Sequence, residues 1–127
     1  MTDTDPRPAV WIGHQRVSAA DVAETTAFWE KVGMRIVHQD VDFAVLELRG
    51  GTHLVVVGNS TSPSDDVPFD VPFDVMVDDL PETWARLRDA GLEPTEIQPG
   101  RIHSSFTITD PAGRPVTVNS SHVVGPV

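Results

Sequence analysis

The sequence repeats itself at an offset of 58 residues, and this repeat limits the possible folds more than any other feature. Residues 21–27, DVAETTA, align with residues 79–85, DLPETWA, and Gly33-Met34 aligns with Gly91-Leu92. In each copy an aspartate stands three residues before a glutamate, which is the spacing of a helix N-cap, and a glycine follows at the C-terminal end. Each copy therefore predicts one helix, and we expect two similar halves.

Both predicted helices have one apolar face, and strand-like segments surround each helix in the same order. Strands are predicted at 10–18, 35–39, 43–48 and 52–57 in the first half, and at 71–77, 94–98, 102–109 and 116–119 in the second. The order is therefore βαβββ twice. Two short helices can cover only one face of such sheets, so the other face is free to curl around a ligand.

The length of 127 residues suits one domain, which buries roughly two-thirds of the surface of the unfolded chain. We predict a flexible N-terminus over 1–9 and a single domain over 10–122, whose modules, 10–58 and 70–122, are joined by a Pro/Ser-rich linker over 59–69. The predicted class is α+β: two paired βαβββ modules whose mixed sheets curl around a central cavity, with the helices on the outer face.

Charge and composition exclude several functions. Nine Lys and Arg residues against 19 Asp and Glu residues give a net charge of −10, which disfavours nucleic acid and anionic membranes as partners. The absence of cysteine excludes disulfides and thiolate chemistry. No apolar stretch approaches the ~20 residues of a membrane span, and the acidic N-terminus lacks a signal-peptide pattern, so we predict a cytoplasmic protein.

These segments resemble the vicinal oxygen chelate superfamily, which includes glyoxalase I, extradiol dioxygenases and the bleomycin-resistance binding proteins. The resemblance covers residues 10–122. It rests on His14 seven residues before Asp21, on residues 27–34 (AFWEKVGM), on residues 90–92 (AGL) and on residues 106–113 (FTITDPAG). It implies the paired-module fold, a small-molecule ligand and a homodimer.

The resemblance also implies where a metal ion is bound in metal-dependent members, and this chain lacks most of those ligands. The four ligand positions fall on His14, Val55, Pro72 and Thr117. Only the histidine is a good metal ligand, because valine and proline side chains cannot coordinate and a neutral hydroxyl is a poor donor beside a carboxylate. We therefore predict no metal ion and no other cofactor.

Strand parity predicts which side chains face the cavity, because alternate residues of a strand point to the same side. Residues with the parity of His14 are expected inside, and the opposite parity forms an apolar set under the helices. The predicted ligand-binding residues are His14, Arg16, Phe43, Glu47, His53, Val55, Asp74, Met76, His103 and Thr117. The predicted core set is Val17, Leu46, Leu48, Leu54, Val56, Phe73, Val75, Val77, Phe106, Ile108, Val116 and Val118.

Three functions fit these residues. The first is a metal-independent protein that sequesters an amphipathic or cationic molecule, such as an antibiotic or a metabolite, because the cavity set is mixed and the region around it is acidic. The second is a lyase- or isomerase-type enzyme with His14 as general base, oriented by Asp74 or Glu47. The third is a metal-dependent dioxygenase or lyase with a shifted site, formed by His14 and His53 with Asp74 or Glu47. Each histidine can also be a simple polar side chain, with His38 and His122 at exposed strand ends.

Overall fold

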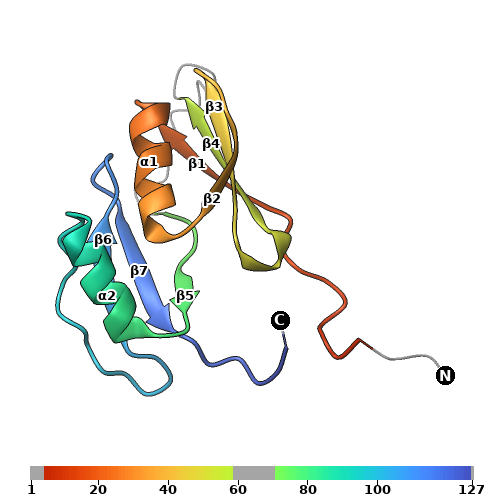
Figure 1. Ribbon diagram of the computed structural model, residues 1–127, viewed down its shortest axis with the longest axis vertical. Coiled ribbons are helices and arrows are strands. Elements are labelled where there is room, and N and C mark those ends of the chain that lie inside the picture. The colour runs from red at the N-terminus through yellow and green to blue at the C-terminus, as the bar shows by residue number, and fades with distance from the viewer. Residues whose placement is uncertain (1–4, 59–70, 127) are drawn as a thin grey trace.

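The computed structural model describes residues 5–58 and 71–126 of the chain. The predicted linker over 59–69 and the first four residues of the predicted flexible N-terminus lie outside the described residues. The first module contains β1 (His14–Ala19), α1 (Val22–Val32), β2 (Arg35–Gln39), β3 (Phe43–Glu47), a 3-10 turn (Arg49–Gly51) and β4 (His53–Gly58). The second contains β5 (Val75–Val77), α2 (Leu80–Asp89), β6 (Ser105–Thr109) and β7 (Pro115–Ser120). The predicted α+β class is confirmed (Figure 1).

Each module builds one mixed sheet around a parallel pair of strands. The first sheet has the order β1-β4-β3-β2, and the second has the order β5-β7-β6. In both, the strand before the helix lies parallel to the last strand of its module, β1 to β4 and β5 to β7. The two halves that repeat in the sequence therefore pair their first and last strands in the same way.

The two helices begin and end where the repeat places them. The Asp21 carboxylate accepts a hydrogen bond from the Glu24 backbone N–H, and the Asp79 carboxylate accepts one from the Glu82 backbone N–H, each at 3.0 Å. After α1, Gly33 has a φ of 137°, a conformation that a residue with a Cβ rarely adopts. The predicted caps are confirmed.

The predicted strand over 94–98 does not form a regular strand. It makes one bridge, between Gln98 and Ser105, and a backbone hydrogen bond from Thr95 to Thr107. Two features interrupt it: Pro94 has no N–H to donate to a ladder, and the Thr95 carbonyl accepts a hydrogen bond from the Trp84 indole at 2.8 Å. The strand predicted at 71–77 is also shorter than expected, because only Val75–Val77 pairs with β7.

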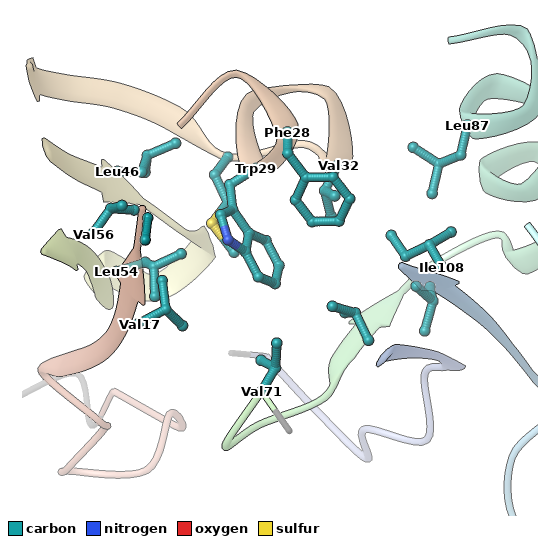
Figure 2. Close-up of a cluster of buried hydrophobic side chains, with 14 of the residues drawn as sticks. Val17, Phe28, Trp29, Val32, Leu46, Leu54, Val56, Val71, Leu87 and Ile108 are labelled. Carbon is teal, nitrogen blue, oxygen red and sulfur yellow. The ribbon is translucent and has the colours of Figure 1, made fainter. Parts of the chain in front are cut away.

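One continuous core joins the apolar faces of both sheets (Figure 2). The Trp29 side chain, on α1, is fully buried, and its ring lies 5.1 Å from that of Phe28 and 5.4 Å from that of Phe73. In the predicted core set, the members on β1, β3, β4, β6 and β7 are buried, while Leu48, Phe73, Val75 and Val77 are half-buried. The parity prediction of the core is confirmed.

Because the apolar faces share one core, the opposite face of each sheet points away from it. His14 and Arg16 on β1, Met76 on β5 and Thr117 on β7 are exposed. Among the described residues, the two sheets do not close into a barrel. The faces predicted to line a cavity are therefore open outer faces within a single chain.

A buried ion pair ties the two modules together at one end. Arg114 Nε donates to Asp110 Oδ2 at 2.8 Å, and the two side chains are 5 % and 0 % exposed. The same guanidinium donates to the Ser18 carbonyl at the end of β1, at 2.6 Å. The turn between β6 and β7 thus contacts the first strand of the other module.

We predict that Arg114→Ala lowers the free energy of unfolding by about 3–5 kcal/mol, because it leaves the Asp110 carboxylate buried without its partner. Urea denaturation followed by tryptophan fluorescence measures this loss. If Arg114→Ala does not fold, Arg114→Lys keeps the charge and is expected to give an intermediate loss.

The matched control is Arg35→Ala, which breaks the Arg35–Glu47 ion pair of 3.0 Å. The Arg35 side chain is 75 % exposed, so the expected change is only about 0–1 kcal/mol. Equal stability of Arg114→Ala and the wild type would contradict the role of the buried pair.

Candidate functional site

The outer face of the first sheet carries a row of ionisable side chains across three strands. His14 on β1 pairs in register with His53 on β4, which in turn pairs with Glu47 on β3. The two imidazole rings are stacked, with centroids 5.8 Å apart. Glu47 forms its ion pair with Arg35 at 3.0 Å, on the side away from the histidines. The row therefore presents two adjacent imidazoles.

The rows that follow along the same strands become progressively apolar. Arg16 lies beside Val55, and Val55 beside Val45. One step further, Val57 lies between Ser18 and Phe43. The Phe43 ring stacks on the His38 ring at a centroid distance of 4.9 Å. The outer face thus changes from imidazole and carboxylate at one end to aliphatic and aromatic at the other, which suits an amphipathic molecule.

A groove of about 650 Å³ lies where the two modules meet. Its walls come from the end of α1, the turn after β3, the strand β5, the start of α2 and the segment after β7. Apolar lining is supplied by Met34, Leu48, Val75, Met76 and Val77. This volume is in the range of pockets that bind small molecules, roughly 300–1,000 Å³.

Negative charge dominates the groove because four carboxylates line it against two arginines, Arg49 and Arg86. Arg49 Nη2 lies 2.7 Å from Asp78 Oδ2, and hydrogen bonding from this guanidinium lowers the pKa of the Asp78 carboxyl. Arg86 donates to the carbonyls of Lys31 and Val32 at the end of α1, at 2.7 and 2.8 Å.

The groove's remaining acidic side chains have no such cation beside them. Among the described residues, Asp74 and Glu82 are in no ion pair, and both line the groove. Asp79, also in the lining, accepts the N-cap hydrogen bond of α2. The groove therefore favours a positively charged ligand.

The predicted site residues fall into three groups. His14, Arg16, Phe43, Glu47, His53 and Val55 lie on the outer face of the first sheet. Asp74 and Met76 line the groove. Thr117 is on β7 of the second sheet and pairs with Thr107, and His103 lies just before β6 with its Nδ1 2.8 Å from the Ser120 carbonyl. Within the described part of the chain, no hydrogen bond joins His14 to Asp74 or to Glu47.

The residues present do not fit the metal ion that the resemblance implies. Residues 5–58 and 71–126 contain no group of three His, Asp or Glu side chains that could hold a metal. Val55 is half-buried between its neighbours on β1 and β3, while Pro72 and Thr117 are exposed. The shifted site is also incomplete, because the His14 and His53 rings are 5.8 Å apart and Glu47, the carboxylate next to His53, is paired with Arg35.

Two arginines that line the groove, Arg49 and Arg86, were not among the predicted site residues. Arg49 precedes the Gly50-Gly51 turn, and Arg86 lies on the polar side of its helix. The helical pattern marks Arg86 only as a surface residue, since nothing local indicates that the end of α1 lies beside it. A basic residue next to a turn was a visible signal for Arg49.

Comparison with known proteins shows one family and one fold. A family model described as a glyoxalase-like domain matches residues 14–119. A lactoylglutathione lyase from Agrobacterium tumefaciens is 21% identical with a TM-score of 0.71, and the alignment covers 91% of this chain and 96% of that one. A bleomycin resistance determinant encoded on transposon Tn5 is 18% identical with a TM-score of 0.60, covering 90% of this chain and 100% of that one.

A third solved structure agrees with these two. The glyoxalase/bleomycin resistance protein/dioxygenase from Alicyclobacillus acidocaldarius is 19% identical with a TM-score of 0.63, covering 92% of this chain and 96% of that one. At these identities the structures establish a shared fold only. A search of curated proteins gave no match. No helix in the described part of the chain is long and apolar enough to cross a membrane.

Proposed function

Because the chain belongs to the glyoxalase-like domain family, we propose that it is a cytoplasmic small-molecule binding protein that works without a metal ion. The main support for this proposal is the identity of the four residues at the positions where the resemblance implies metal ligands. At these four positions the chain has a single histidine, His14, and three residues that are poor metal ligands, namely Val55, Pro72 and Thr117. One imidazole without further ligands does not make a metal centre.

The ligand we propose is an amphipathic, cationic molecule that the protein sequesters, such as an antibiotic or a metabolite. The apolar lining of the groove supports an apolar body, and Asp74 and Glu82 support a positive charge. The similarity to the Tn5 bleomycin resistance determinant supports an antibiotic as one such ligand.

We propose that two copies of the chain form a homodimer. A pocket buries about 70–90% of a small ligand's surface, whereas the outer face of the first sheet is open in one chain. Phe43 and Met76 are 38% and 45% exposed. A second copy packed on these side chains buries apolar surface and also covers the ligand. Light scattering of the purified protein is expected to give twice the mass of one chain. A light-scattering mass of one chain for protein that binds its ligand would contradict the proposed homodimer.

We predict that the protein binds thioflavin T, a flat cationic dye, more tightly than the anionic dye 1-anilinonaphthalene-8-sulfonate. Asp74→Asn and Glu82→Gln should each weaken thioflavin T binding about two- to fivefold, since an exposed charge pair is worth about 0.2–1 kcal/mol. Fluorescence titration measures both affinities, and added salt should weaken binding of the cation.

The control variant is Asp40→Asn, which removes an exposed carboxylate outside the groove and should leave dye binding unchanged. Tighter binding of the anionic dye, or equal effects of the Asp40 and Asp74 variants, would contradict the assignment of the groove. Bleomycin in place of the dye, followed by calorimetry, tests the antibiotic directly.

The stacked pair of His14 and His53 favours a second candidate, an enzyme that uses His14 as general base. Neutral imidazole is the usual proton acceptor near pH 7, and this one is exposed to a ligand on the outer face. The similarity to a lactoylglutathione lyase supports lyase- or isomerase-type chemistry as the reaction class.

For this candidate, His14→Ala is expected to lower the rate of lactoylglutathione formation about 10²–10⁴-fold, the usual contribution of a general base. The assay is run in chelator, so that any rate measured is independent of added metal. His38→Ala, on β2 at the opposite edge of the sheet from β1, is the control and should keep the rate. A rate that His14→Ala leaves unchanged would rule out the general-base role.

A further inference from the structure

Two histidines meet at the end of the second sheet, in a place that the proposed function does not use. His103 lies just before β6, and His122 lies just after β7. Their rings are arranged edge to face, with centroids 4.4 Å apart. His122 was expected to be an exposed residue at a strand end. It is exposed, but its ring lies against that of His103.

The position of the His103 ring is fixed by a hydrogen bond. His103 Nδ1 lies 2.8 Å from the Ser120 carbonyl oxygen, and His103 is half-buried. A carbonyl can only accept, so Nδ1 carries a proton, and in the neutral ring Nε2 then keeps its lone pair. This is how metal-binding histidines are commonly held: one ring nitrogen donates to a carbonyl, which orients the other toward the metal.

The backbone around both histidines is held in place before any ligand binds. The Ser104 N–H donates to Ser120 Oγ at 3.0 Å, and the Ser120 N–H donates to the Ser104 carbonyl at 2.9 Å. On the other side, the Ser121 N–H donates to the Val77 carbonyl at 3.1 Å. The turn before His103 requires Gly100, because a Cβ there would lie 2.4 Å from the His103 carbonyl oxygen.

The separation of the rings suits two ligands of one metal ion. Metal–nitrogen bonds of about 2.0–2.1 Å place the ring centroids of two imidazoles in adjacent coordination positions about 4.5–5 Å apart. The observed centroid distance of 4.4 Å lies just below this range. Imidazole nitrogen suits late divalent transition metals, namely nickel, copper and zinc.

We propose that His103 and His122 bind one late divalent transition-metal ion, with water in the remaining coordination positions. The site lies in the second module, whereas the His14 and His53 pair lies in the first, so the two pairs can be tested separately. Two protein ligands make an accessible, reversible site rather than a closed structural one.

The test is calorimetric titration of the untagged, full-length protein with Zn²⁺, together with electron paramagnetic resonance of the Cu²⁺ form. We expect one metal ion per chain and a copper spectrum with nitrogen coupling from two imidazoles. His122→Ala should weaken Zn²⁺ binding by about tenfold or more, because even residues behind the ligands are worth about 10–100-fold. His122 is exposed, so this change opens no cavity in the core.

His103→Asn is the second variant, and it should weaken Zn²⁺ binding to a similar extent. Circular dichroism establishes that both variants are folded. The matched control is the double variant His14→Ala/His53→Ala, which should bind Zn²⁺ as the wild type does. The proposal is overturned if the wild type binds no metal, if His122→Ala binds equally well, or if binding is lost in the His14/His53 variant.

Discussion

The burial of two apolar sheet faces in a single core is the constraint on which this structure depends. Each module has one sheet and one helix, so neither module can cover its own apolar surface completely. Trp29 of the first module reaches Phe73 of the second, and both belong to the shared core. Once these faces are packed together, the other face of each sheet must point outward. The position of the outer face that carries His14 and His53 follows from the packing of the core.

Three arginines connect the modules, and their surroundings give them different roles. Arg114 is buried with Asp110 and contacts the end of β1, so its loss leaves an unpaired buried charge. Arg86 donates to the last carbonyls of α1, which would otherwise lack partners at the helix end. Arg49 pairs with Asp78 at the surface, where solvent weakens the interaction. The first two hold the modules in place, while the third mainly sets the charge of the groove.

Local patterns in the sequence predicted the parts of the fold that depend on local rules. The helix caps at Asp21 and Asp79 follow from spacing, and the core set follows from the alternation of side chains in strands. The strand predicted at 94–98 fails for one local reason, Pro94, which has no backbone N–H to donate, and for one reason that the strand pattern does not contain. The second reason is that the Trp84 indole N–H donates a hydrogen bond to the Thr95 carbonyl, which would otherwise be an acceptor for a neighbouring strand.

The candidate site was predictable to the same extent. Parity placed His14, His53 and Glu47 on one face, and the register then aligned them in one row. The groove and the contact between His103 and His122 required knowledge of how the modules pack and where the chain turns after β7. No spacing within the sequence carries that information, because the two histidines of that contact come from segments on either side of a hairpin.

The separation of the two faces also has an evolutionary consequence. Side chains of one parity form the core that stabilises the fold, while the opposite parity of the first sheet lies outside this core, so we expect mutations there to cost little folding free energy. Valine, proline and threonine can therefore stand where the resemblance implies metal ligands while the core around Trp29 is kept intact. A fold divided in this way can change the side chains of its outer face while its core stays the same.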